Sequence, residues 1–97
     1  MVVDSDDEQS RIKNNLAVVR CYLKNHFPLY TITEISVPNL YHEFVVTNNT
    51  LHKRYRLKVE WARLSYRSNT PENTRSALDS GNVASGMIQV GDSDYYW

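Results

Sequence analysis

The 97-residue sequence predicts a single α+β domain, with an N-terminal helix on an antiparallel meander of three, or four, strands and a short second helix after the third strand. Two observations support this fold class. Apolar residues recur at helical spacing in the first quarter of the chain, and a segment that alternates apolar and basic residues lies near its middle. A chain of this length buries roughly two-thirds of the surface that its unfolded form exposes, which is enough for one core.

The first helix is expected to begin near Ser5 and to end before Pro28. Ser5 and Glu8 have the spacing of a capping box, and acidic residues in a first turn complement the helix dipole. Proline disfavours helical geometry in the residue before it, so the helix stops there. The expected core-facing stripe consists of Ile12, Leu16, Val19, Leu23 and Phe27, widened by Val18 and Tyr22.

Two strands are expected next, joined by short turns at Pro38-Asn39 and residues 48–50. In the first strand, residues 29–37, the apolar alternation changes phase, which predicts a β-bulge near Thr33 and Glu34. The second strand spans residues 40–47, and its apolar side is expected to hold Leu40, Phe44 and Val46, with His42 among them.

The third strand shows the clearest alternation, which runs through residues 53–66. Its period of two predicts one dry face and one charged face. The dry face would hold Tyr55, Leu57, Val59 and Trp61, and the charged face Arg54, Arg56, Lys58 and Glu60.

The second helix is expected to start with Thr70 as its cap and Pro71 at its first position, and to stop at Gly81. Residues 83–90 fit either a further short helix or a fourth, edge strand. The whole chain, residues 1–97, is expected to be one domain, with residues 1–4 and 91–97 as flexible or docking tails.

Eleven basic and eleven acidic residues cancel, which argues against attraction of the whole molecule to nucleic acid or to an anionic membrane. The single cysteine, Cys21, cannot form an internal disulfide. The chain starts with an acidic stretch and not a secretory signal, and no apolar run approaches the ~20 residues that cross a bilayer. We therefore expect a cytoplasmic protein without a membrane partner.

No catalytic residue, metal site or cofactor is expected. His26, His42 and His52 have no cysteine, aspartate or second histidine at metal-ligand spacing, and the sequence lacks a glycine-rich phosphate loop. His42, which lies among apolar residues, reads as a core or sheet histidine with its hydrogen bonds satisfied. Cys21 and His26 lie about 140° apart around one helix, so a thiol nucleophile would need His42 or His52 as its base.

The basic third strand is the best candidate for a binding site. Arg54, Arg56 and Lys58 would project from one face about 7 Å apart. At the C-terminal end, Tyr95 and Trp97 would dock on this domain's own sheet, or the aromatic residues there would insert into a partner. The full set of expected partner-binding residues is Arg54, Arg56, Lys58, Arg63, Tyr66, Arg67, Tyr95, Tyr96 and Trp97.

Two function classes fit these residues. The first is a non-enzymatic protein-interaction module, of the adaptor or inhibitor type, that binds an acidic partner surface through the basic face. The second is a nucleic-acid-binding domain, because the spacing of the cations is close to that of successive phosphates. Cross-strand pairs with Glu34 and Glu43 would use up part of the charge. The small, uncharged face of the first helix around Ala17 and Cys21 suggests a homodimer contact.

The order helix, three strands, helix is similar to that of double-stranded-RNA-binding domains. Those domains have a lysine cluster at the start of their second helix, whereas this chain has residues 71–75 there, with Arg75 as the single cation. The resemblance is one of element order alone, and the sequence reproduces the motifs of no family.

Overall fold

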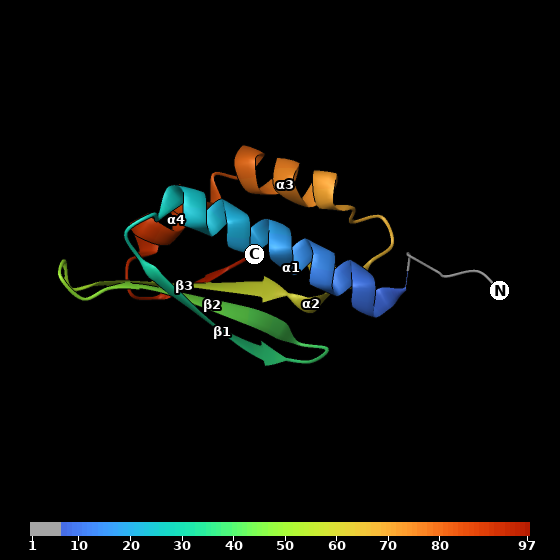
Figure 1. Cartoon of the computed structure of the whole chain (residues 1–97), viewed down its shortest axis with the longest axis horizontal. Helices are drawn as coiled ribbons and strands as arrows, with labels where there is room; N and C mark the ends of the chain where they lie inside the picture. The colour runs from blue at the N-terminus through green and yellow to red at the C-terminus, as the bar shows by residue number, and fades with distance from the viewer. Residues whose placement is uncertain (1–6) are drawn as a thin grey trace.

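The structure is a computed structural model that describes residues 7–97. Three helices, α1, α3 and α4, lie over one face of a four-stranded sheet (Figure 1). None of the helices in the described part is long and apolar enough to cross a membrane. The elements in chain order are α1 (Glu8–His26), β1 (Thr31–Val37), β2 (Tyr41–Asn48), β3 (Lys53–Glu60), α2 (Trp61–Ser65), α3 (Pro71–Ser80), α4 (Val83–Val90) and β4 (Asp94–Tyr96).

The α+β class is confirmed, but the sheet is not a purely antiparallel meander. Its strand order is β1-β2-β3-β4, and the first three strands pair antiparallel as expected. The fourth strand, β4, lies parallel to β3, with Leu57 opposite Tyr95. A parallel neighbour requires a crossover connection, and α2, α3 and α4 provide it. Residues 91–97, expected as a flexible or docking tail, dock on the domain and contain the strand that completes the sheet.

The helix ends follow local chemistry. Pro28 lies just beyond α1, and the amide of Phe27 donates to the carbonyl of Leu23 at 2.8 Å. The side chain of Thr70 caps α3 and accepts from the amide of Asn73 at 3.2 Å, and Gly81 ends that helix, both as expected. The expected capping box includes Ser5, which lies outside the described residues.

The bulge predicted in the first strand is absent. The β1–β2 register runs without interruption from the pair Thr31–Thr47 to the pair Val37–Tyr41. The change of phase in the sequence instead leaves Ile35 on the outer face, 57% exposed. Leu40, expected in the core, is 65% exposed in the turn before β2.

The third strand is shorter than expected, because it ends at Glu60 and α2 begins at Trp61. The amide of Trp61 donates to the carbonyl of Leu40 at 3.1 Å, outside the strand ladder. Helical spacing then brings Trp61 and the fully buried Leu64 against the same core, which a continued strand would not do.

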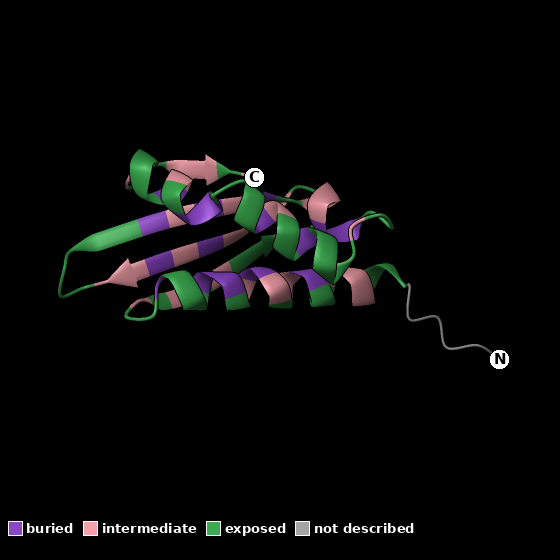
Figure 2. Ribbon diagram, turned by 90° about the horizontal axis from the view of Figure 1, so that it is seen from above, coloured by how far each residue is buried: buried purple, intermediate pink, exposed green. Residues whose placement is uncertain are grey.

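One core fills the space between the sheet and the helices (Figure 2). The C-terminal half of α1 buries its expected stripe, whereas Ile12 and Leu16 are only half-buried. The fully buried large side chains include Val19, Leu23, Phe44, Val46, Leu57, Val59, Leu64, Leu78, Val83 and Met87.

Asn15 is a fully buried polar residue that the sequence pattern did not indicate. Its amide nitrogen donates to the carbonyls of Leu64 and Asn69 at 3.0 and 2.8 Å, and its side-chain oxygen accepts from Thr74 Oγ1 at 3.0 Å. These bonds join α1 to α2, to the following loop and to α3. Every polar atom of the amide group thus has a partner, as burial requires.

We predict that Asn15→Ala lowers the free energy of unfolding by about 2 kcal/mol, because two backbone carbonyls and a hydroxyl lose their partner in the interior. Urea unfolding followed by tryptophan fluorescence measures the change. The adjacent Asn14 is exposed, so Asn14→Ala is a matched control that should unfold near the wild-type midpoint. Equal midpoints for the two variants would contradict the assigned role of Asn15.

Candidate interaction surface on the open face of the sheet

The sheet face opposite α1, α3 and α4 is called the open face here, since none of these helices covers it (Figure 1). The alternation of β3 orients its side chains: Tyr55, Leu57 and Val59 are buried under the helices, and the residues between them point outward. By the cross-strand register, the open face carries Thr33, Ile35, Tyr41, Glu43, Val45, Arg54, Arg56, Lys58, Asp94 and Tyr96.

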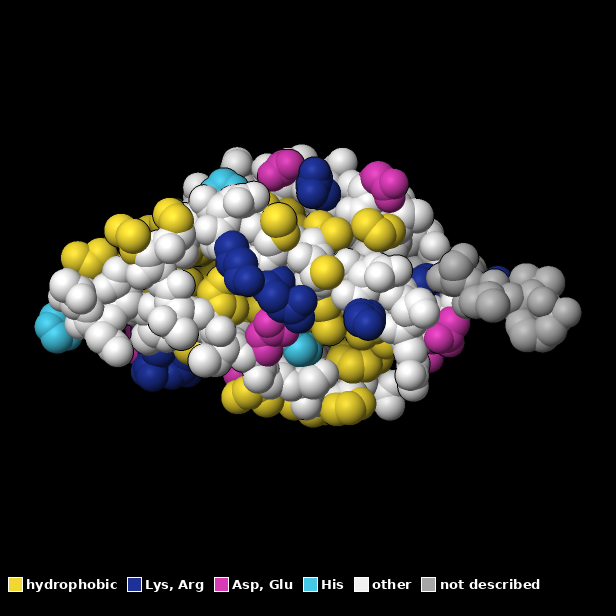
Figure 3. All heavy atoms as spheres, in the orientation of Figure 1, with side chains coloured by type: hydrophobic (Ala, Val, Ile, Leu, Met, Phe, Trp, Pro, Cys, Tyr) yellow, Lys and Arg dark blue, Asp and Glu magenta, His cyan; other side chains and the backbone are white. Residues whose placement is uncertain are grey.

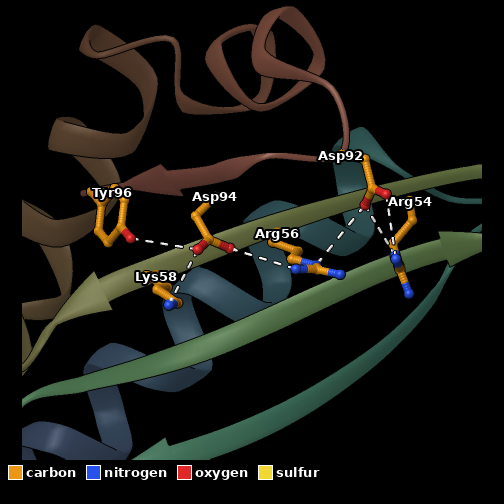
Figure 4. Close-up of polar contacts among 6 residues, drawn as sticks. All are labelled: Arg54, Arg56, Lys58, Asp92, Asp94 and Tyr96. Atoms are coloured by element: carbon orange, nitrogen blue, oxygen red, sulfur yellow. Dashed lines mark hydrogen bonds and ion pairs between the residues drawn. The ribbon is translucent and has the colours of Figure 1, made fainter.

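Three of the four cations of β3, Arg54, Arg56 and Lys58, face two carboxylates from the C-terminal segment (Figure 4). Arg54 donates from Nε and Nη2 to the two oxygens of Asp92, at 3.0 and 3.3 Å. Lys58 Nζ lies 3.2 Å from Asp94 Oδ2. Arg56 lies between them, 3.9 Å from Asp92 and 4.0 Å from Asp94. We call these five residues the β3–β4 charge ladder.

The charge ladder shifts the pKa of three side chains, Arg54, Lys58 and Asp92. The hydrogen bond from Arg54 lowers the pKa of Asp92, and the same bond raises the pKa of Arg54. The bond to Asp94 raises the pKa of Lys58. Such exposed pairs add little to stability. They do change the charge of the surface, because two carboxylates beside three cations leave a net charge of about one positive unit in the charge ladder.

Two tyrosines flank Lys58, at one end of the charge ladder. Lys58 Nζ lies 4.7 Å from the ring centroid of Tyr41 and 5.6 Å from that of Tyr96. The Tyr96 hydroxyl donates to Asp94 Oδ2 at 3.4 Å, and the residue is 67% exposed. The open face therefore combines accessible aromatic surface with charges that are already paired.

The other aromatic residues of the C-terminal segment dock on their own domain. Tyr95 packs against α4 at Gly86, and Trp97 donates from its amide to the carbonyl of Lys58 at 2.9 Å. The guanidinium of Arg63 stacks over the Trp97 ring, 4.3 Å from its centroid. Of the three expected aromatic anchors, Tyr96 alone points outward from the sheet.

Tyr66 and Arg67 are both exposed, but they lie in the loop between α2 and α3. Neither belongs to a strand of the open face. The structure thus divides the expected binding residues among the charge ladder with Tyr96, the Arg63–Trp97 stack, the docked Tyr95 and this loop.

Glu34 does not neutralise the basic strand, because it points to the helix side of the sheet. It accepts from Arg20 Nη2 of α1 at 2.8 Å and lies 2.9 Å from His42 Nε2. Neutralisation comes instead from Asp92 and Asp94. Their two-residue spacing matches the alternation of Arg54, Arg56 and Lys58, and that spacing is the signal that sequence reasoning missed.

Neither His42 nor His52, the two histidines that could have served as a base for Cys21, lines the hollow that contains Cys21. Cys21 and His26 line a hollow of about 220 Å³ with α3 residues. His42 is buried against Phe44 on the core side of β2, and His52 lies in the turn before β3. Within residues 7–97, no three histidine, cysteine or acidic side chains gather as metal ligands would.

No family model, curated protein or solved structure matches the chain. Function is therefore inferred from the chemistry of the described surface.

We predict that Gly86→Ala disturbs β4, because an added Cβ would lie 2.5 Å from the Tyr95 ring. The expected loss is about 2 kcal/mol in the free energy of unfolding, typical of overpacking. Urea titration tests this, with Ser85→Ala at the exposed neighbouring position as control. Adding Gly86→Ala to a Tyr95→Ala variant should cost little more, whereas additive losses would place the clash elsewhere.

The ion pair of Glu34 with Arg20 should make the stability of the fold depend on pH. The hydrogen bond from Arg20 lowers the pKa of Glu34 from the usual 4.5, against the effect of burial and with help from His42. A carboxyl group whose pKa is lowered in the folded state stabilises the fold when the pH is above its usual pKa. The contribution is lost as the pH falls from that usual pKa towards the lower folded-state pKa. Glu34→Gln should therefore cost about 1 kcal/mol at neutral pH, and the difference should shrink on acidification.

Urea unfolding of both proteins, at pH values from neutral to about 3, measures that difference. Glu43→Gln, on the opposite face of the sheet, is the control and should keep most of the wild-type stability. A wild-type advantage over Glu34→Gln that stays constant down to the acid end would contradict the proposed ion pair.

Proposed function

We propose that this chain is a non-enzymatic protein-interaction module, of the adaptor or inhibitor type, that binds a protein partner through the open face of its sheet. The observation that supports the proposal is an uncovered sheet face that carries Tyr96 and Ile35, 67% and 57% exposed. The side chains of Arg54 and Arg56, 46% and 34% exposed, lie on the same face. Tyrosine and arginine are the side chains enriched at the energetic centres of protein interfaces.

Arg56 is the proposed anchor for an acidic group of the partner. It lies 3.9 and 4.0 Å from the carboxylates of the charge ladder, which is beyond hydrogen-bond distance. The guanidinium thus keeps donors that can bind a partner carboxylate in the two-pronged geometry that arginine favours. Val45 lies opposite Arg56 on β2 and supplies apolar surface beside it, and Thr33 is next in the same cross-strand row.

The charge ladder favours a protein partner over nucleic acid. A phosphate backbone would have to contact several of the cations in a row, and Asp92 and Asp94 already pair with Arg54 and Lys58, whereas a single partner carboxylate needs Arg56 alone. Nucleic-acid binding depends on cations that are available to neutralise phosphates. One observation still favours this alternative: Tyr41 and Tyr96 flank Lys58 on a bare sheet, as in platforms on which bases stack.

A photo-crosslinking amino acid placed at Tyr96 tests the proposal in extract of the native cells. We expect a crosslinked protein that survives nuclease treatment, and none when the same amino acid replaces Ser85, an exposed residue of α4. Binding measured with the captured partner should fall about tenfold or more for Arg56→Ala. The exposed Arg75 on α3 supplies the control Arg75→Ala, which should bind as the wild type does.

Two outcomes would count against a protein partner. A crosslink that disappears after nuclease treatment, together with oligonucleotide binding that weakens steeply with salt, would assign the open face to nucleic acid. The same crosslinked species from positions 96 and 85 would remove the open face as the binding site.

A further inference from the structure

The outer edge of β1 is an unpaired strand edge within residues 7–97, because β1 pairs with β2 on its other side only. Natural proteins protect such edges with lysines, prolines, bulges or very short strands. β1 is seven residues long, contains neither lysine nor proline, and keeps an uninterrupted register with β2. It is therefore a long edge with an uninterrupted row of backbone groups, available to pair with another strand.

The charges along β1 favour pairing with a neutral strand. Glu34 is its only ionisable residue, and Arg20 and His42 already hold that carboxylate on the helix side. On the open face β1 carries threonine and the exposed Ile35. A basic or acidic peptide would find no countercharge along this edge, whereas a copy of β1 has the same neutral character.

An apolar groove borders the same edge on the helix side. It has a volume of about 540 Å³ and lies between the N-terminal half of α1, the β1–β2 turn and the start of α2. Its apolar lining includes Ile12, Leu16, Ala17, Pro38 and Trp61. Figure 3 shows apolar side chains gathered on this side of the molecule, around and below α1.

We propose that β1 pairs antiparallel with β1 of a second copy of this chain, around a two-fold axis at Ile35, so that two sheets join into one. When two β1 strands pair around a two-fold axis with both helix layers on the same side of the joined sheet, odd-numbered residues face odd-numbered ones and even-numbered residues face even-numbered ones. An axis at Glu34 would place two carboxylates opposite each other. An axis at Ile35 places Glu34 opposite Ser36 of the second copy, whose hydroxyl can donate to it.

The groove gains an occupant in this arrangement. With Ile35 at the axis, Ile32 of the second copy stands opposite Pro38, on the helix side where the groove opens. Leu29, three residues before Ile32, is 80% exposed in the single chain. The two-fold axis brings Leu29 of each copy towards the groove of the other, so both unprotected apolar features are buried together.

This contact differs from the homodimer expected around Ala17 and Cys21. Ala17 lines the groove at the β1 side of α1, but Cys21 lines the hollow between α1 and α3. The proposed dimer therefore includes the first residue and leaves the second accessible. The dimer does not depend on the proposed function, because it uses the edge of β1. The open faces of the two copies would lie side by side on one joined sheet and stay uncovered.

Sedimentation equilibrium over a concentration series up to about 100 µM tests the pairing, since a small interface of this kind is typically weak. We expect wild-type protein to approach twice the 11.3 kDa chain mass as its concentration rises. Ile35→Lys places two lysines together at the axis and should sediment as a monomer. Ile88, 53% exposed on α4, gives the matched control, and Ile88→Lys should dimerise like the wild type.

A cysteine at the axis tests the register independently. In a Cys21→Ser background, Ile35→Cys should form a symmetric disulfide under mild oxidation, since facing residues of antiparallel strands lie within disulfide distance. Ile88→Cys should crosslink far more slowly. Wild-type protein that stays monomeric throughout would overturn the proposal and leave the edge to a strand of another protein. A dimer that Ile35→Lys does not weaken, or equal crosslinking at both cysteines, would overturn it too.

Discussion

The parallel pairing of β4 with β3 determines the character of the open face. This pairing places Asp94 beside Arg56 and Lys58, and it brings Asp92 within hydrogen-bond distance of Arg54. A strand with three outward cations thereby becomes part of a surface of paired charges with exposed tyrosines. In the same segment Tyr95 and Trp97 pack against the core. Docking of residues 92–97 therefore also neutralises the cations of β3.

The helix layer supports that arrangement from the other side of the sheet. Asn15 bonds to the carbonyls of Leu64 and Asn69 and so fixes the point where the chain leaves β3 and enters the crossover. The hydroxyl of Tyr22 accepts from the amide of Ala84, which ties the start of α4 to α1. Through these two side chains one helix orients the whole connection that delivers β4 to the sheet.

Local patterns in the sequence predicted the parts of the fold that depend on neighbouring residues. The Thr70-Pro71 start and Gly81 end of α3 and the alternation of Tyr55, Leu57 and Val59 are examples. Hydrogen bonds and ion pairs between distant parts of the chain were not predicted, because periodicity does not show which distant residues are in contact. Asn15 and Thr74 are far apart in sequence, and so are Arg54 and Asp92.

The bulge predicted near Thr33 had a different cause. The phase change predicted a backbone irregularity, but in the structure it reflects a regular strand with an apolar residue on each face, Ile32 on the core side and Ile35 on the open face. For the candidate site, Arg54, Arg56 and Lys58 were predicted to lie on one face of the strand, and they do. Their neutralisation by Asp92 and Asp94 could not be predicted without knowing that the last segment returns parallel to β3.

The order of the chain has a consequence for folding. The helix α1 and the three antiparallel strands are complete well before β4 leaves the ribosome, because β4 begins at residue 94. Until β4 docks, β3 is a border of the sheet with its arginines unopposed and its backbone groups unsatisfied. Because β4 follows the other described elements in the chain, this edge of the sheet closes after they have formed, in a step that needs contacts between distant parts of the chain.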